Sequence, residues 1–155
     1  MSVSTRLKTL LDENHISYTP MVHTTAFTSQ GAAATMKVSG KELAKTVVVR
    51  AGDFTVLAVL PAAHHASLEK LGNVLGKPVR LATEQEFGEL FPDCELGAMP
   101  PFGELYGLPI YVDKSLAADE EIVFNAGTHH DAIRLRYADF ARLAKPTVCS
   151  FASKG

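Results

Sequence analysis

Five segments of the chain predict helices, from apolar residues at helical spacing, from helical propensity or from capping residues. Leu7, Leu10 and Leu11 mark the first helix, and Ser4 or Thr5 can cap the exposed backbone amides at its start. An alanine-rich run predicts a second helix over 28–36, and residues 68–75 predict a third, with Gly76 as a left-handed cap. A fourth helix begins with a capping box at Thr83 and Glu86 and reaches the core through Phe87 and Leu90. The last predicted helix covers residues 137–143.

Runs of β-branched and aromatic residues between these helices predict the strands. The clearest run is Thr46–Arg50, and residues 55–60 are expected to return beside it after a turn at 51–54. In the last predicted strand, apolar residues alternate with arginines, so that the apolar side chains can face the core and the arginines face outward. The remaining predicted strands are 18–22, 78–81, 109–113, 121–125 and 132–136.

The order of these elements predicts a single α+β domain, residues 1–155, built on a mixed sheet. Apolar residues make up 46% of the sequence, which is enough to form a hydrophobic core. No internal repeat or linker divides the chain. Residues 91–109 contain four prolines and three glycines and predict a long loop, and only the last few residues are expected to fray.

Composition excludes several classes of protein. A net charge of −2 argues against a protein that coats nucleic acid along its length, although it permits one that grips a single RNA end. Cys94 and Cys149 lie far apart and outside any CxxC pair, which argues against a disulfide framework or a zinc site. No apolar run approaches the roughly 20 residues that span a bilayer, and the N-terminus lacks a signal peptide. We therefore expect a soluble, cytoplasmic protein.

Lys45 is the first candidate for chemistry, because it lies between the polar segment 40–45 and a strand that is expected to be buried. Lys37, Lys41 and Lys45 are spaced by four, which on a helix would place three positive charges on one face. Such a stripe could bind a phosphate backbone. It could equally be a solvated edge.

Two glycine-containing segments are further candidates. In the loop 97–101 two prolines restrict the backbone while Gly97 permits a close approach to a ligand. In the turn 126–131 Gly127 suits a sharp bend, Thr128 can form hydrogen bonds, and two histidines titrate near neutral pH. Either segment could also be an ordinary connection.

Metal catalysis and covalent catalysis find little support in the sequence. His64 and His65, together with His129 and His130, could supply four metal ligands, but neither HExxH nor HxxxH occurs. No GxSxG motif is present, and no pair of carboxylates suggests an acid and a base. We therefore expect no metal and no other cofactor.

Taken together, the segments resemble the YbaK and prolyl-tRNA synthetase-associated editing domain family. The resemblance extends from Leu7 to Leu143 and depends on the order and spacing of its motifs rather than on any one of them. The motifs are His23-Thr-Thr before the alanine-rich run, Glu42–Val49, Val79–Ala82, the GxxxP loop Gly97–Pro101 with Phe102-Gly103, Ile110–Asp113 and Ala126-Gly127.

The resemblance implies a compact α+β fold with a barrel-like mixed sheet, and hydrolysis of the ester between an amino acid and the terminal adenosine of tRNA. In that family, the lysine at the position of Lys45 is the characteristic site residue. The GxxxP loop, with Gly97 and Pro101, shapes the wall that receives the aminoacyl group. The pair His129 and His130 falls where alanine-specific members use a histidine to sort substrates, and we favour His130. The chain therefore resembles the alanine-type branch.

Such an ester is already activated, so catalysis needs a positioned water and a stabilised oxyanion more than a protein nucleophile. We hypothesise that Lys45 binds the 3′ end of the tRNA, and that backbone amides around Gly97 and Gly127 hold the ester carbonyl. The ribose 2′-OH would orient the water, as the resemblance suggests.

Selectivity is expected to come from pocket size, because a synthetase distinguishes one methylene by only about 1–3 kcal/mol. Alanine on proline tRNA is the first expected substrate, with cysteine and serine as alternatives, and prolyl-tRNA synthetase as a transient partner. Rival functions are a module that binds the aminoacyl-tRNA end without turnover, and a metal-dependent hydrolase that uses the four histidines. Candidate pocket residues are His23, Thr24, Phe27 and Met99.

Overall fold

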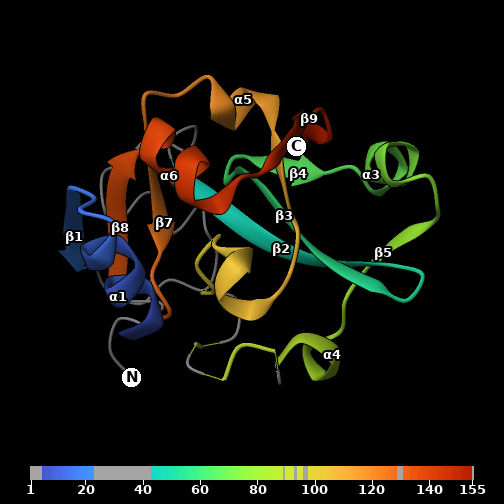
Figure 1. Cartoon of the computed structure of the whole chain (residues 1–155). Coiled ribbons are helices and arrows are strands. Elements are labelled where there is room, and N and C mark those ends of the chain that lie inside the picture. The colour runs from blue at the N-terminus through green and yellow to red at the C-terminus, as the bar shows by residue number, and fades with distance from the viewer. Residues whose placement is uncertain are drawn as a thin grey trace.

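The computed structural model describes residues 5–22, 43–88, 90–92, 94–95, 98–128 and 131–154. A mixed sheet of eight strands lies at the centre, and helices pack around it (Figure 1). The strand order is β1 (Tyr18–Val22), β8 (Asp131–Arg136), β7 (Glu121–Asn125), β2 (Leu43–Ala51), β3 (Phe54–Pro61), β6 (Ile110–Asp113) and β9 (Thr147–Cys149), with β5 (Val79–Leu81) paired to β2.

The sheet mixes both pairing directions. β2 lies parallel to β7, and β6 lies parallel to both β3 and β9, whereas the other pairs in this sheet are antiparallel. A second, two-stranded sheet joins β4 (His64–Ala66) to β10 (Ala152–Lys154). The predicted α+β fold on a mixed sheet is confirmed.

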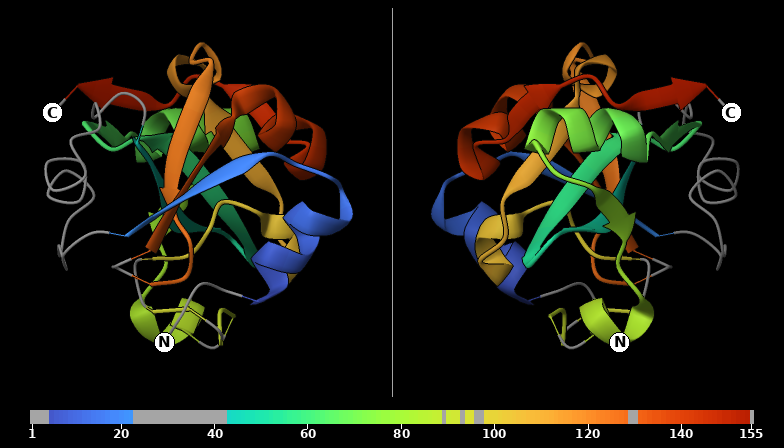
Figure 2. Two further views of the ribbon diagram at one scale, coloured as in Figure 1. Left: turned by 90° about the vertical axis from the view of Figure 1, so that its left-hand side faces the viewer. Right: turned by 90° about the vertical axis from the view of Figure 1, so that its right-hand side faces the viewer.

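The helices cover the ends and faces of the sheet. In Figures 1 and 2, α5 and α6 lie at one end of the molecule and α4 at the opposite end, while α3 lies beside β5. The helices are α1 (Thr5–Glu13), α3 (Leu68–Leu75), α4 (Glu84–Gly88), α5 (Lys114–Ala117) and α6 (Tyr137–Ala144), and a 3₁₀ turn, η1, spans Gly103–Tyr106.

Two predicted helix signals are confirmed in atomic detail. Gly76 caps α3 with a φ of 74°, in the left-handed region that favours glycine. At the start of α4, the Glu86 amide donates to the Thr83 hydroxyl over 3.2 Å, and the Thr83 amide donates to the Glu86 carboxylate over 2.9 Å. These reciprocal bonds form the capping box that the sequence predicted.

Apolar side chains fill both faces of the sheet. On one face, Phe102 packs edge-on against Phe124 and Phe140, with ring centroids 5.6 and 5.4 Å apart, and α1 adds Leu7 and Leu11. On the other face, a cluster that includes Leu71 of α3 and Phe151 covers strands β2 and β3. The following residues of β2 and β3 belong to that second cluster: Val49, Val56, Ala58 and Leu60.

Asp113 connects the sheet to the end of the chain. Its buried carboxylate accepts hydrogen bonds from the amides of Phe151 at 2.7 Å and Ala152 at 2.8 Å, and from the amide of Ser115 at 3.0 Å. Burial by itself raises the pKa of Asp113, but the hydrogen bonds from Ser115, Ala152 and Phe151 outweigh it and hold the pKa below its ordinary value. The carboxylate therefore fixes the segment that leads into β10.

The prediction that the last residues fray is wrong for β9 and β10. Both segments are strands, and the sequence analysis also missed β4, α5 and η1. β10 pairs with β4, whose residues lie some 90 positions earlier, in the register Ser153 to His65. Such long-range pairing leaves little local pattern in three-residue strands.

The structure also changes the position of Lys45. β2 begins at Leu43, so Lys45 is the third residue of a strand rather than the residue before one. The predicted helical stripe through Lys37, Lys41 and Lys45 is therefore wrong at Lys45. Lys37 and Lys41 lie outside the described residues, as do Ser4 and the predicted helix over 28–36.

Candidate active site

Lys45 lies on one face of β2, beside the end of β7. In this parallel pair Leu43 lies opposite Val123 and Ala44 opposite Phe124. The next position in register places Lys45 beside Asn125. Because side chains alternate between faces along a strand, Lys45 and Asn125 project from the same face as Leu43 and Val123.

The surroundings of Lys45 are mainly apolar. Lys45 pairs with Leu60 of β3, which belongs to the cluster under α3, and Leu43 packs with Val123, Ala62 and Ala132. Half-burial of the ammonium group in this setting lowers the pKa of Lys45 below its ordinary value. Among the described residues no hydrogen bond or ion pair holds Lys45. A partly desolvated cation of this kind is suited to bind an anionic or strongly polar ligand group.

The turn that follows β7 is joined to the loop before Met99 by two backbone hydrogen bonds. The amide of Gly127 donates to the carbonyl of Ala98 over 2.9 Å, and the amide of Glu95 donates to the carbonyl of Gly127 over 2.7 Å. Gly127 has a φ of 103°, which side-chain-bearing residues rarely adopt. The residues on either side of the GxxxP glycine are thus bonded to the turn that contains Gly127.

These bonds change the expected role of Gly127. We expected backbone amides around Gly97 and Gly127 to hold the ester carbonyl, and among these the amide of Gly127 itself is bonded to Ala98. Gly127 instead fixes the shape of the turn and its distance from the loop. The second glycine of the hypothesis, Gly97, lies outside the described residues.

A hydrogen-bond network within the turn fixes the positions that flank the histidine pair. Thr128 is buried; its hydroxyl donates to the Asp131 carboxylate over 2.7 Å and accepts from the Asp131 amide over 3.0 Å. The amide of Ala126 donates to the Asp131 carbonyl over 2.9 Å. The network therefore holds both ends of the turn that carries His129 and His130, which themselves lie outside the described residues.

Replacing Thr128 with valine keeps the shape of the side chain and removes this hydroxyl. We expect the free energy of unfolding to fall by about 1–3 kcal/mol, because the partly buried Asp131 amide loses its acceptor. Urea denaturation measures the loss. Thr147→Val, at an exposed position of β9, is the matched control and should change stability by less than about 0.5 kcal/mol. Equal losses in both variants would contradict a structural role of Thr128.

The described residues of the GxxxP loop are buried rather than open to solvent. Met99 packs in the cluster of Phe102 and Phe124, and Pro101 is buried beside it. Met99 therefore acts first as a core residue. The remaining predicted pocket residues, His23, Thr24 and Phe27, lie outside the described part of the chain.

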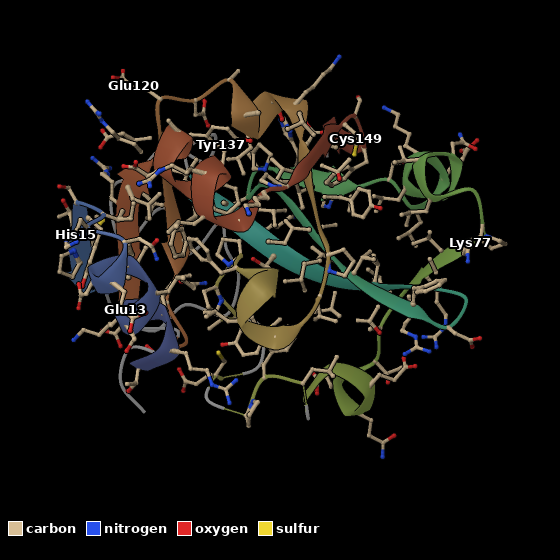
Figure 3. All side chains as sticks on the ribbon, viewed as in Figure 1. Glu13, His15, Lys77, Glu120, Tyr137 and Cys149 are labelled. Atoms are coloured by element: carbon tan, nitrogen blue, oxygen red, sulfur yellow. The ribbon has the colours of Figure 1, made fainter. Side chains whose placement is uncertain are left out.

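Two surface pockets lie away from Lys45. One of about 560 Å³ lies between α3 and β5, and one of about 250 Å³ lies at the β2–β3 hairpin end, lined by Phe54 and Tyr111 among others. Lys77 lines both pockets and also stacks on the Phe54 ring, with its Nζ 4.4 Å from the ring centroid (Figure 3). Neither pocket includes a predicted site residue.

Titratable groups elsewhere do not form a second catalytic centre in the ranges that the structure describes. No three of the His, Cys, Asp and Glu side chains there could hold a metal ion, and His64 and His65 lie in β4. Burial, and secondarily the charge of Asp113, raises the pKa of the Cys149 thiol (Figure 3). Cys149 is thus a poor nucleophile.

Of the helices described, none has the length and apolar character needed to cross a membrane.

The sequence analysis did not single out Asn125 and Asp131, which adjoin the candidate site residues Gly127 and Thr128. Asn125 is half-buried at the end of β7, and Asp131 accepts the Thr128 hydrogen bond. The sequence feature that could have identified Asn125 is a polar amide directly after the buried run 122–124.

Comparisons with known proteins identify the family to which the chain belongs. A family model described as the aminoacyl-tRNA editing domain matches residues 23–143. The multifunctional Ser/Thr-tRNA deacylase ProXp-y of Escherichia coli strain K12 is 37% identical over 98 residues, and its counterpart in strain O157:H7 gives the same values. The matched region is 62% of this chain and 58% of the relative, so the chain spans less than two thirds of the relative's length.

Solved structures agree in fold. The hypothetical protein APE2540 matches with a TM-score of 0.86 and 20% identity, over 96% of this chain and 99% of that one. A protein provisionally described as a trans-editing enzyme for prolyl tRNA synthetase matches with a TM-score of 0.83 and 23% identity, over 98% and 99% of the two chains. Because the family model covers Lys45, the loop and the turn, and most of the chain around them, the chain belongs to the aminoacyl-tRNA editing domain family.

Proposed function

We propose that the protein is a deacylase that acts in trans on tRNA carrying a wrongly attached small amino acid. A water oxygen attacks the ester carbonyl carbon, the bond from that carbon to the ribose oxygen breaks, and the ribose oxygen receives a proton. The products are the free amino acid and uncharged tRNA. The observation that carries this proposal is Lys45, a half-buried cation without a described protein partner, in a chain of the editing domain family.

Lys45 supplies positive charge where the reaction needs it. An ammonium group in a partly apolar setting interacts more strongly with a phosphate or a developing oxyanion than it would in water. The turn around Gly127 and the loop before Met99 form the adjacent wall, held by their two backbone bonds. In this mechanism, the ribose hydroxyl next to the ester orients the water, and His130 sorts substrates. No protein nucleophile and no metal take part.

Two substrate classes have separate support. The resemblance to the alanine-type branch favours alanine on proline tRNA. The name of the Escherichia coli relative, a Ser/Thr-tRNA deacylase, favours serine and threonine esters. All three amino acids are small, and a second site that admits them by size would correct errors that a synthetase cannot exclude by binding alone.

The test is a panel of tRNAs charged with radiolabelled amino acids: alanine, serine and cysteine on proline tRNA, serine and threonine on a second tRNA, and correct prolyl-tRNA. We expect rapid loss of label from one of the small esters and none from prolyl-tRNA. Protection of every ester would instead identify a module that binds the aminoacyl-tRNA end. Loss of activity in a chelator would identify the metal-dependent hydrolase.

The proposal includes a transient contact with prolyl-tRNA synthetase in the cytoplasm. Its support is the description of the solved relative as a trans-editing enzyme for that synthetase. Adding the synthetase to the deacylation assay should raise the rate at low tRNA concentration if the two proteins meet on the tRNA. An unchanged rate would indicate that the protein works alone.

A further inference from the structure

Asn125 carries a buried polar atom for which the described residues supply no hydrogen bond. Its side-chain oxygen, Oδ1, is buried and has no hydrogen-bond partner among the residues that the structure describes. Buried polar atoms are nearly always bonded in folded proteins, so an exception calls for a physical reason. The described residues offer this oxygen no donor, yet the chain keeps a polar amide there.

The environment of Asn125 makes the amide unnecessary for folding. Asn125 lies opposite Ala132 in the β7–β8 pair. It projects from the same face as Val123, which packs in the apolar cluster with Leu43, Ala62 and Ala132. A leucine of similar size would extend this cluster.

The position of Asn125 points to a ligand instead. It is next in register to Lys45 on the neighbouring strand, and adjacent strands lie about 4.8 Å apart. Two residues later the chain reaches Gly127, whose backbone bonds fix the turn. Asn125 thus stands between the cation and the turn that carries the histidine pair.

We infer that the Asn125 amide oxygen accepts a hydrogen bond from a hydroxyl group of the aminoacyl-adenosine end, and so contacts the substrate of the proposed function on which this inference rests. The charge of Lys45 determines which group of the substrate can donate this hydrogen bond. A second cation, such as the substrate ammonium group, would be repelled at this position. A neutral hydroxyl is not. Two hydroxyls have this chemistry: that of the terminal ribose and that of a serine or threonine side chain.

The inference is tested with Asn125→Leu, which keeps the size of the side chain and removes the amide. We expect the midpoint of thermal unfolding to rise by about 2–4 °C, because a buried unsatisfied group is removed. We expect kcat/KM for deacylation to fall about 10- to 100-fold, as a hydrogen bond to the substrate is lost. Asn73→Leu, at an exposed position of α3, should change neither quantity.

A stability gain with an activity loss separates a substrate contact from a structural role. If Asn125 only supported the fold, Asn125→Leu and the smaller Asn125→Ala would both lower the unfolding midpoint and would reduce activity only through loss of folded protein. That result, or unchanged kcat/KM in a folded Asn125→Leu variant, would overturn the inference.

Seryl and alanyl esters on the same tRNA distinguish the two hydroxyls. A loss restricted to the seryl ester assigns the hydrogen bond to the amino acid side chain, and an equal loss on both assigns it to the ribose. A wild-type protein that hydrolyses no ester of the panel would refute the proposed function, whereas an active wild type with an equally active Asn125→Leu variant would refute this inference alone.

Discussion

Replacing Lys45 with alanine should lower kcat/KM for deacylation by about 100- to 1,000-fold and leave the fold intact. Removal of a single group that stabilises a developing oxyanion typically costs this much. The fold should persist because no described residue pairs with the ammonium group and burial disfavours its charge. Single-turnover deacylation measures the first effect, and circular dichroism with thermal unfolding measures the second.

Lys45→Met sharpens the same experiment, because methionine fills the space of the lysine stem without the charge. The lowered pKa of Lys45 means that its positive charge reduces the stability of the folded protein at neutral pH. The methionine variant should therefore unfold at a higher temperature than wild type at pH 7. The difference should shrink as the pH rises through the lowered pKa towards about 10.4, where lysine loses its charge in the unfolded chain too.

Lys70, exposed on α3, provides the control for Lys45. Lys70→Ala should retain wild-type kcat/KM and stability. An active Lys45→Ala variant, within about threefold of wild type, would contradict the role of Lys45 in the reaction. A Lys45→Met variant that is less stable than wild type at pH 7 would contradict the description of Lys45 as a destabilising buried charge.

Replacing Asp113 with alanine should reduce the free energy of unfolding by about 3–4 kcal/mol. The buried amides of Phe151 and Ala152 and the amide of Ser115 would lose their common acceptor. Urea denaturation measures this effect. The exposed Asp53, in the β2–β3 turn, gives the control, and Asp53→Ala should change stability by less than about 0.5 kcal/mol.

The same carboxylate should make stability depend on pH. Since the pKa of Asp113 is lower in the folded protein than in the unfolded chain, its contribution is fully present above about pH 4 and is lost as the pH falls through the folded value. Wild type should therefore lose stability below pH 4 more steeply than Asp113→Asn. Parallel pH profiles of the two proteins would contradict this assignment.

The sequence predicted those elements whose patterns are long enough to read locally. The β2–β3 hairpin has β-branched runs on both sides of a turn, α3 ends at a glycine cap, and α4 begins with a capping box. The short strands β4 and β10 carry no such pattern, because their pairing is decided by tertiary contacts far along the chain. The buried acceptor at Asp113, which fixes that end of the chain, could be recognised only in three dimensions.

The position of Lys45 illustrates the same limit within the site. Its segment, Glu42-Leu-Ala-Lys45, consists of residues that favour helices, but pairing with β7 and β3 makes Leu43–Lys45 part of β2. The sequence identified Lys45 and the turn at Gly127 as candidates. It did not identify Asn125, because only the register of β7 with β2 reveals that this amide lies beside the lysine.

The bonds that join Gly127 to Ala98 and Glu95 are made entirely by the main chain. At positions other than Gly127, a change of side chain therefore leaves these two bonds in place. Insertions and deletions are different, because a change of length in one segment separates the carbonyl and the amide that form each hydrogen bond. Among homologues, the lengths of these two segments should be nearly constant, and where one varies the other should vary with it.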